Sequence, residues 1–460
     1  MKQFDAIIIG SGQGGTPLSK KLAKAGWKTA LIEKRWIGGT CINDGCTPTK
    51  TMVASARIAY LAANSKKLGI DIDHFAIDFP AIHQRKNEIV SSFRNGALKG
   101  LEETENLEVI FGEARFTGAK TISVALNSGG EEEFSAKHIF INTGAFTTIP
   151  DIKGLNDISY LTSTTILDLT EIPQHLLIIG GSYIAMEFGQ MFSRFGSKVT
   201  MLEWSGNFLQ KEDPDISDCL CGIMQGEGIT IHKNAKTQRF QKTADGIKAF
   251  VLIDDKMEEI SCSHVLLAAG RTPQTKSLHT QLAGIETDEK GYIKVNDQLQ
   301  TNAPGIYALG DVKGGPAFTH ISYNDHLVII KNLLHNAGAS IKGRQVPYCM
   351  FTDPQLGRVG ITETEARKKG LNIKVVSLSM EKVARAIETA ETRGIMKAVV
   401  DAETKKILGV AVIGEQGGEI MSVLQVAMMG NITYEQIREN IFAHPLYAES
   451  LNNLFMQLDK

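Results

Sequence analysis

The chain has 460 residues, of which 43% are hydrophobic and 22% are charged, and its formal net charge is −2. These values are ordinary for a soluble globular protein of about three domains, and they argue against a nucleic-acid or membrane partner. No apolar run approaches the roughly 20 residues that cross a bilayer, and no signal segment precedes the first strand-like run. Six cysteines are too few for a disulfide scaffold and fit a reducing compartment. We therefore expect a cytoplasmic protein in which any disulfide is catalytic.

A dinucleotide-binding pattern opens the chain. The apolar run at 6–9 predicts a buried parallel strand. The glycines of a GxGxxG motif follow it, at Gly10, Gly12 and Gly15. Residues 29–32 predict the next strand, which ends at Glu33, and this spacing is close to that at which an acid binds a ribose hydroxyl. The strand, turn, helix, strand and acid together predict a nucleotide site.

The same pattern recurs in the middle of the chain. Residues 176–179 predict a strand, the motif GGSYIA begins at Gly180, and residues 199–202 predict a strand that ends at Glu203. The third motif position is Ser182 rather than glycine, but serine is small enough for the backbone to approach a pyrophosphate at the helix N-terminus. Two such patterns predict two bound dinucleotides.

Glu203 bears on which nicotinamide nucleotide binds. A carboxylate accepts hydrogen bonds from a ribose 2′-hydroxyl and repels a 2′-phosphate. Trp204 follows it, and no arginine lies within residues 205–212. The sequence therefore favours NADH over NADPH. The alternative is that Glu203 ends the strand in solvent.

The segment 38–50, GGTCINDGCTPTK, places Cys41 and Cys46 five residues apart. In a regular helix, Cα atoms at that spacing lie roughly 8.7 Å apart, whereas a disulfide needs about 4.4–6.8 Å. A bridge therefore requires irregular backbone, which Gly45 can supply. From these residues alone three interpretations stay open: a redox-active disulfide, two unrelated buried thiols, or a zinc site, for which no second Cys or His pair stands out.

Further strands are predicted along the rest of the chain. Each of the runs 139–145, 265–271 and 306–312 reads as a strand that ends in a turn of small residues. In the last third, a helix is predicted at 362–369, strands at 398–400 and 407–413, and a helix at 420–429.

Seven motifs in one order carry a resemblance that extends over nearly the whole chain. They are GSGQGG (10–15), GGTCINDGCTPTK (38–50), NTGA (142–145), GGSYIAME (180–187), AAGRTP (268–273), ALGD (308–311) and HPLYAE (444–449). With them the chain resembles the class I flavin-dependent pyridine nucleotide–disulfide oxidoreductases, the family of glutathione reductase, dihydrolipoamide dehydrogenase and mercuric reductase. The resemblance favours the redox-disulfide interpretation of the two cysteines.

The resemblance implies an α/β fold with two Rossmann-like dinucleotide-binding domains and a C-terminal α+β dimerisation domain. The implied boundaries are an FAD-binding domain at 1–149, an NAD(P)-binding domain at 150–274, a central domain at 275–341 that completes the FAD site, and a dimerisation domain at 342–460.

The resemblance also implies the residues that bind each cofactor. Those implied for FAD are Gly10, Gly12, Gly15, Glu33, Thr40, Lys50, Ala114, Thr143, Gly144, Asp311 and Thr319. Those implied for the nicotinamide dinucleotide are Gly180, Ser182, Tyr183, Glu203 and Gly270. Tyr183 would cover the flavin where nicotinamide docks. Lys50 and Glu187 would pair beside the flavin ring, where a cation stabilises the negative charge of the reduced form.

The catalytic roles follow from the same resemblance. Cys46 would face the flavin and Cys41 would attack the acceptor. Because only a thiolate is a competent nucleophile, a base is needed, and His444 is the candidate, oriented by Glu449 and supplied across a subunit boundary. A symmetric homodimer is therefore implied.

Three departures from the family pattern bear on the acceptor. No cysteine follows Cys349, so the C-terminal cysteine pairs of mercuric reductases and high-molecular-weight thioredoxin reductases are missing. Asp44 stands between the two cysteines where the family usually has an apolar residue. It either attracts a cationic acceptor such as Cu(II) or caps a turn. His320 follows Thr319 where the family often has proline, and either lies near the flavin or is packed away.

The implied function is an NAD(P)H-dependent flavoprotein reductase, with NADH preferred, that reduces a small disulfide or a metal ion. One alternative is a dihydrolipoamide dehydrogenase. Another is a flavin NADH oxidase or transhydrogenase in which the cysteines are incidental. A third is a flavoprotein without catalytic activity, against which the complete set of catalytic residues argues.

Overall fold

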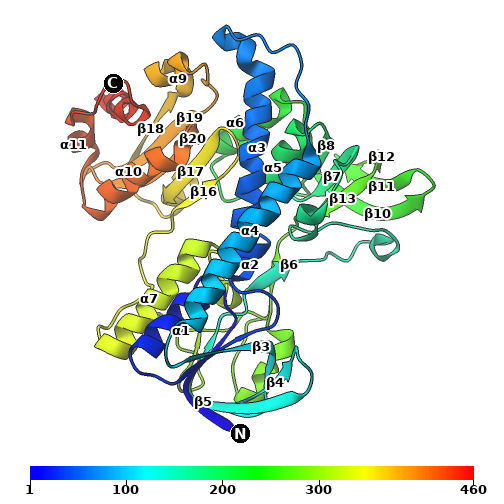
Figure 1. Ribbon diagram of the computed structural model, residues 1–460. Coiled ribbons are helices and arrows are strands. Elements are labelled where there is room, and N and C mark those ends of the chain that lie inside the picture. The colour runs from blue at the N-terminus through cyan, green and yellow to red at the C-terminus, as the bar shows by residue number, and fades with distance from the viewer. Residues whose placement is uncertain (460) are drawn as a thin grey trace. The chain divides into compact units, whose positions relative to one another are not determined.

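The computed structural model describes residues 1–459, and the chain divides into two compact units. The first unit consists of Met1–Thr51, Gln84–Thr148 and Gly270–Arg344, and the second of Met52–His83, Ile149–Ala269 and Gln345–Lys460. Each unit therefore gathers three separate segments of the chain (Figure 1). Two long helices, α3 (Cys46–Asn64) and α4 (Phe79–Glu102), contain residues of both units.

The first unit is built on a six-stranded sheet. Its strands are β1 (Lys2–Ile9), β2 (Thr29–Glu33), β3 (Leu107–Phe116), β4 (Thr121–Leu126), β5 (Glu131–Ile141) and β15 (Ile306–Ala308). β1 lies between β2 and β5 in parallel, with Ile9 opposite Ile32 and Ile141, and β15 is parallel to β5. β4 is antiparallel to both β3 and β5. The βαβ start of this sheet is the arrangement that the first motif predicts.

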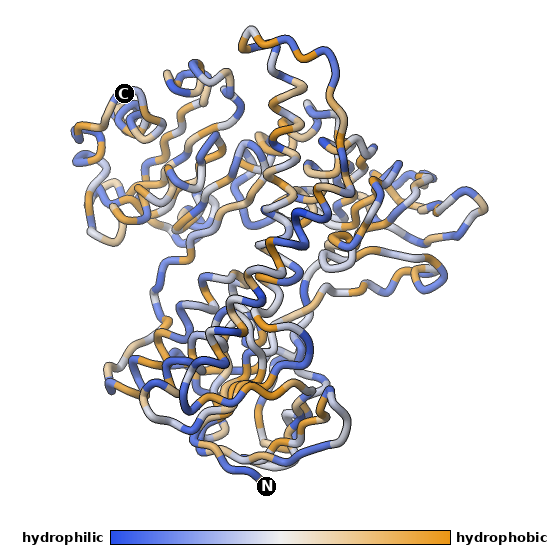
Figure 2. Tube along the Cα trace, in the orientation of Figure 1, coloured by the Kyte–Doolittle hydropathy of each residue, from blue (hydrophilic) through white to orange (hydrophobic). Residues whose placement is uncertain are grey.

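Helices and a small second sheet complete the first unit. They are α1 (Gly15–Lys24), α2 (Gly39–Asn43), α7 (Thr319–His335), and the antiparallel pair β6 (Ala145–Thr147) and β14 (Arg271–Pro273). Leu18 and Leu22 of α1 pack with Ile329 of α7 and with Ile8 of the sheet in one buried cluster. Figure 2 colours the chain by hydropathy, and in this unit the centre of the parallel strand β2 and the second half of β1 are apolar and buried, as expected for strands covered on both faces.

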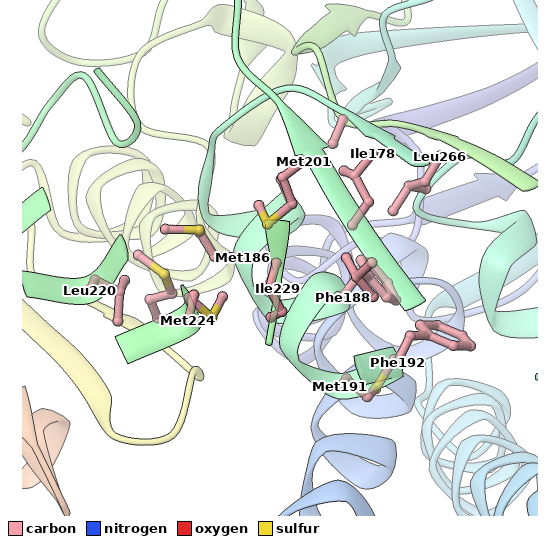
Figure 3. Packing of buried hydrophobic residues seen from close by; sticks show 14 of the residues in the cluster. Ile178, Met186, Phe188, Met191, Phe192, Met201, Leu220, Met224, Ile229 and Leu266 are labelled. Atoms are coloured by element: carbon pink, nitrogen blue, oxygen red, sulfur yellow. The ribbon is translucent and has the colours of Figure 1, made fainter. Parts of the chain in front are cut away.

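The nucleotide-binding part of the second unit has a four-stranded parallel sheet. Its strands, in spatial order, are β13 (His264–Leu267), β7 (His175–Ile179), β8 (Lys198–Leu202) and β9 (Thr230–His232). It is accompanied by α5 (Tyr183–Arg194), α6 (Pro214–Gly226) and an antiparallel sheet of β10 (Ala235–Thr243), β11 (Gly246–Ile253) and β12 (Lys256–Cys262). Figure 3 shows its core, in which Met186, Phe188, Met191 and Phe192 of α5 lie against Ile178, Met201 and Leu266 of the strands.

The C-terminal part of the second unit is an α+β structure. Its antiparallel sheet has the order β16 (Tyr348–Met350), β17 (Gln355–Gly360), β20 (Ile407–Gly414), β19 (Ile395–Asp401) and β18 (Ile373–Ser379). Its helices are α8 (Glu363–Lys368), α9 (Ala384–Glu388), α10 (Gly417–Met429), α11 (Tyr434–Glu439) and α12 (Ser450–Met456). Thr362 and Glu365 form a capping box at the start of α8, which gives the predicted helix its N-terminus.

The predicted α/β class is confirmed, and each of the three runs predicted to be a strand ending in a turn of small residues contains a strand followed by such a turn. The run 306–312 is a strand only to Ala308 and then forms a 3₁₀ turn at Gly310–Lys313. The run 139–145 ends as a strand at Ile141. The run 265–271 contains two strands rather than one, because Gly270, with φ +130°, separates β13 from β14.

Candidate functional site

The first glycine motif forms a tight cradle after β1. Gly10 has φ +101°, and a Cβ there would lie 2.4 Å from the carbonyl oxygen of Asn142. A Cβ on Gly15 would lie 2.1 Å from the carbonyl oxygen of Gly10, so only glycine lets α1 start this close to the strand. The Gly15 amide donates to Asn142 Oδ1 at 2.8 Å. Asn142, which sequence reasoning did not single out although it opens the NTGA motif, therefore holds this turn.

Glu33 ends β2 beside this cradle. Its Oε2 accepts hydrogen bonds from the Ser11 amide at 3.0 Å and the Ser11 hydroxyl at 2.7 Å, and its Oε1 accepts from the Arg35 amide at 2.9 Å. The carboxylate is thus oriented next to the glycine turn, as a ribose-binding acid requires. Ser11 is a second residue that the sequence analysis missed, although it stands inside the quoted GSGQGG motif.

The second glycine motif reproduces the geometry of the first. Gly180 has φ +118°, and a Cβ there would lie 2.4 Å from the carbonyl oxygen of Ala268. The Gly180 amide donates to Leu202 O at 2.8 Å, as the Gly10 amide donates to Ile32 O at 2.8 Å. Ser182 is the N-cap residue of α5 and Tyr183 is its first residue, so both predicted residues stand at the helix N-terminus.

Glu203 is held in place rather than directed into solvent. It is 5% exposed. Its Oε1 accepts from the Ser205 amide at 3.0 Å, the Ser205 hydroxyl at 2.9 Å and Gln210 Nε2 at 3.3 Å. Its Oε2 lies 2.7 Å from where a Cβ on Gly181 would be, that is, against the glycine turn. These contacts argue against the alternative that Glu203 ends the strand in solvent.

The backbone is broken between Cys41 and Cys46, as a close thiol pair requires. Cys41 lies in α2, which ends before Asp44, and Cys46 is the first residue of α3. Gly45 contributes through its small size rather than an unusual φ, because a Cβ there would lie 2.9 Å from the Thr40 carbonyl oxygen. The two thiols are hydrogen-bonded to each other, which confirms that they are neighbours and not unrelated buried thiols.

Thr319, the first residue of α7, completes the thiol site. Its Oγ1 lies 3.2 Å from Cys46 Sγ and is also hydrogen-bonded to Cys41. The Cys46 thiol and burial raise the pKa of Cys41 strongly, whereas Thr319 and the Lys50 ammonium lower it. Cys41 therefore keeps its proton at neutral pH. A Cys41 nucleophile then needs a separate base.

Asp44 is already paired with a cation. It is the C-cap residue of α2, its amide donates to Thr40 O at 2.9 Å, and its carboxylate forms an ion pair with Arg35. Arg94 lies nearby, donating from Nε to Asn43 Oδ1 at 2.7 Å. These contacts support the turn-capping interpretation of Asp44 over the attraction of a cationic acceptor.

Asp311 supplies a test of whether the first unit fits FAD. It lies in the 3₁₀ turn after β15, and burial raises the pKa of its carboxyl, which Arg271 and Lys313 oppose. Arg271 Nε lies 3.9 Å from Asp311 Oδ2 and, within residues 1–459, is buried without a hydrogen-bond partner. A half-buried carboxylate and a buried guanidinium nitrogen with an unsatisfied N–H match the hydroxyls and phosphates of FAD, so the residues present fit that group.

His444 and Glu449 meet in the C-terminal part of the second unit. His444 Nδ1 lies 2.9 Å from Glu449 Oε2 and 3.1 Å from Oε1, and the His444 side chain is 70% exposed. The carboxylate can therefore hold the imidazole through Nδ1 and leave Nε2 for an external partner.

Four further predicted residues lie in the first unit. Thr40 lies in α2 and the buried Ala114 in β3. Thr143 Oγ1 donates to Gln274 O at 2.8 Å, and Gly144, with φ +71°, follows it.

Four predicted residues have a placement that bears on the nicotinamide and flavin assignments. Gly270 belongs to the first unit, unlike the other residues implied for the nicotinamide nucleotide. Glu187 lies on α5 in the second unit, and its Oε1 accepts from the Phe351 amide at 2.8 Å. Lys50 lies in the first unit, so its pairing with Glu187 stays a prediction. His320 is exposed and stacks on Phe318, with ring centroids 5.4 Å apart.

Comparison with known proteins places these features in a family. The chain matches the family model described as pyridine nucleotide-disulphide oxidoreductase over residues 4–325, and the model of that family's dimerisation domain over residues 346–455. It is 40% identical to the probable pyridine nucleotide-disulfide oxidoreductase RclA of Escherichia coli (strain K12) over 459 residues, which are 99% of each chain. It is 35% identical to a mercuric reductase of Lysinibacillus sphaericus over 457 residues, 99% of this chain and 83% of the relative.

A solved structure gives the same result. The Cu(II) complex of the HOCl-induced flavoprotein disulfide reductase RclA from Escherichia coli matches with a TM-score of 0.92 at 39% identity, over 100% of both chains. Two dinucleotide-binding folds and a close cysteine pair define the class of flavoprotein disulfide reductases. The chain belongs to the pyridine nucleotide-disulfide oxidoreductase family. It is an FAD- and pyridine nucleotide-dependent oxidoreductase with that family's C-terminal dimerisation domain.

Within residues 1–459, no helix is both long and apolar enough to cross a membrane. Over the same residues, no three His, Cys, Asp or Glu side chains are grouped so as to hold a metal ion.

Proposed function

We propose that this protein transfers electrons from NADH, by way of bound FAD and the Cys41–Cys46 pair, to a small disulfide or a metal ion. The proposal rests on the close approach of Cys41, Cys46 and Thr319, which come from three different helices. Cys46 Sγ lies 3.2 Å from Thr319 Oγ1. FAD, when bound, supplies the exchange of a hydride for two electrons. The proposed cofactor-binding residues and the four proposed domains are those that the family resemblance implies.

The two cysteines have different roles in this proposal. Cys41 Sγ, once deprotonated, attacks one sulfur of the acceptor disulfide, so that a mixed disulfide forms and one thiolate leaves. Cys46 Sγ then attacks Cys41 Sγ, which closes the intramolecular disulfide and releases the second thiolate. One NADH and one proton restore the dithiol. The raised pKa of Cys41 supports this division, because the thiol that attacks is the one that requires a base.

His444 is proposed as that base, and a homodimer supplies it to the site of the partner subunit. The 2.9 Å contact between His444 Nδ1 and Glu449 supports a fixed orientation, which leaves Nε2 to take the Cys41 proton and return it to the leaving thiolate. Lys50 and Glu187 are proposed to pair beside the flavin. The dimerisation domain at residues 346–455 supports the homodimer.

NADH is the proposed nucleotide because the Glu203 carboxylate is fixed by Ser205 and Gln210 against the glycine turn. A fixed carboxylate accepts hydrogen bonds from a 2′-hydroxyl and repels a 2′-phosphate. A kcat/KM ratio that favours NADPH over NADH would contradict this assignment. A cytoplasmic location fits the low cysteine content.

An acceptor screen tests the function. The holoenzyme is reduced anaerobically with NADH, and reoxidation is followed after oxidised glutathione, lipoamide, Cu(II) or Hg(II) is added. Cu(II) is included because the solved Escherichia coli relative is described as a Cu(II) complex. Dihydrolipoamide with NAD tests the reverse, dehydrogenase direction.

Variants separate dithiol chemistry from flavin chemistry. Cys41→Ser should lower acceptor reduction by orders of magnitude, since it removes the nucleophile. Cys219→Ser, a change at a half-buried thiol of α6, is the matched control and should behave as wild type. Full turnover with oxygen or an acceptor in Cys41→Ser would instead indicate an oxidase or transhydrogenase with incidental cysteines.

A further inference from the structure

The segment that carries His444 and Glu449 has a single buried side chain. Among residues 440–449, only Tyr447 is buried, with 6% of its surface exposed, whereas the His444 side chain is 70% exposed. The Tyr447 ring packs in the same buried cluster as Leu451. A segment with few buried contacts is held weakly, so the position of these two residues depends on Tyr447.

The Tyr447 hydroxyl is bound by two other elements. It donates to Glu415 Oε2 at 2.5 Å, and it lies 2.7 Å from the hydroxyl of Thr389. Glu415 stands in the turn between β20 and α10, and Thr389 is the C-cap residue of α9. Burial and the Glu415 carboxylate raise the pKa of Tyr447, so the phenol stays protonated and can donate throughout the neutral range.

Glu415 is itself fixed by charge. Its Oε1 accepts from Arg57 Nη2 at 2.5 Å, and Arg57 Nη1 donates to Asp353 Oδ1 at 2.7 Å. Asp353 Oδ2 in turn accepts from Arg194 Nη1 at 2.7 Å. Charge-assisted hydrogen bonds of this kind are short and directional, so the acceptor of the Tyr447 hydroxyl is held rigidly.

We propose that Tyr447 is a positioning residue that fixes the His444–Glu449 pair for proton transfer, through its hydrogen bond to the Arg57-bound carboxylate of Glu415. Tyr447 lies three residues after His444 and two before Glu449, so it restrains the backbone between the two residues. The inference rests on the proposed role of His444 as the base. Loss of this restraint lets the His444 imidazole move away from the Cys41 thiol whose proton it is proposed to take.

The test compares two identical changes in the same part of the chain. Tyr447→Phe removes the hydroxyl and keeps the buried ring. Tyr434→Phe is the matched control, because Tyr434 is 3% exposed and its ring packs on Phe455 with centroids 5.9 Å apart. Each purified holoenzyme is checked for flavin content and dimer mass. We then measure NADH-dependent disulfide reduction across pH, and direct NADH-dependent reduction of a dye that takes electrons from the flavin.

Tyr447→Phe should lower kcat for disulfide reduction by about 10- to 100-fold, the cost of misplacing a catalytic group by about 1 Å. Dye reduction and KM for NADH should stay at wild-type values, and the pH profile should lose the limb that His444→Gln also removes. Glu415→Gln should give the same pattern, and it decides the matter if Tyr447→Phe does not retain flavin.

Three results overturn the inference, and they are distinguishable. If His444→Gln lowers disulfide reduction but Tyr447→Phe and Glu415→Gln behave like Tyr434→Phe, the positioning role of Tyr447 is refuted. The proposed role of His444 as the base is then retained. If His444→Gln has no effect, both the proposed role of His444 as the base and the positioning role of Tyr447 are refuted. An equal loss of dye reduction and disulfide reduction in Tyr447→Phe would show a merely structural role.

Discussion

The hydroxyl of Thr319 should stabilise a thiolate in the cysteine pair, and Thr319→Val tests this because it keeps the side-chain shape and removes the donor. Thr319 Oγ1 lies 3.2 Å from Cys46 Sγ and is hydrogen-bonded to Cys41 as well, where it lowers the pKa. A hydrogen bond to a charged group contributes about 1.5–3 kcal/mol, and about 1.4 kcal/mol is a tenfold change in an ionisation equilibrium. The thiolate population at a fixed pH should therefore fall by about 10- to 100-fold in the variant.

Alkylation measures this population. The holoenzyme is reduced anaerobically with one equivalent of NADH, and the rate of iodoacetamide alkylation is followed by mass spectrometry of the peptides that contain Cys41 and Cys46. Because only the thiolate reacts, the rate at neutral pH should fall by the same factor. Thr104→Val is the control, since the Thr104 hydroxyl donates to Gly100 O at 2.8 Å in α4. Equal alkylation rates in Thr319→Val and wild type would refute the reasoning.

Two buried groups, Glu212 and His326, should make the free energy of unfolding depend on pH in opposite directions. Glu212, with a side chain 2% exposed and 3.3 Å from Arg358 Nε, has its pKa raised by burial from 4.5 to about 7. The fold favours the protonated carboxyl, so this contribution to stability is complete below pH 4.5 and is lost as the pH rises to 7. Glu212→Gln has no such loss. Its free energy of unfolding, relative to that of wild type, should therefore rise by up to about 3 kcal/mol between pH 4.5 and 7. His326 is 0% exposed, and burial lowers its pKa from 6.5 to about 4. The fold favours the neutral imidazole, so this contribution to stability is complete above pH 6.5 and is lost as the pH falls to 4. Between pH 6.5 and 4, the free energy of unfolding of His326→Leu should therefore fall by up to about 3 kcal/mol less than that of wild type. Urea unfolding of each variant beside wild type, at several pH values, measures both differences, and a difference that does not vary with pH would contradict the corresponding assignment.

Local patterns in the sequence predicted the parts of the site that depend on neighbouring residues. The glycines at Gly10 and Gly180 were predicted from spacing, and both have the positive φ and the close carbonyl contact that exclude a side chain. The break between Cys41 and Cys46 followed from the reach of a disulfide, although Gly45 permits it by close approach rather than by an unusual φ. The capping residue Thr362 lies at the start of its predicted helix for the same local reason.

Contacts between distant segments were not predicted. Asp44 was expected either to attract a cation or to cap a turn, and its pairing with Arg35 depends on how the chain after β2 turns back on α2. Asn142 was overlooked although it joins Gly15 to Leu309, because its partners come from segments far apart in the sequence. The long helices α3 and α4 and the antiparallel sheet of β10, β11 and β12 were not predicted either, since no motif marks them.

The sequence by itself determined the two nucleotide-binding patterns, the cysteine pair and the family, because glycine turns, strand ends and acid spacing depend on a few neighbouring residues whose backbone freedom is a local property. Only the tertiary structure decided which side chains surround these motifs. Thr319 meets Cys46 across 273 residues, and Tyr447 meets Glu415 across 32. Such contacts form only when whole sheets and helices pack into a common core, and no short stretch of sequence encodes that packing.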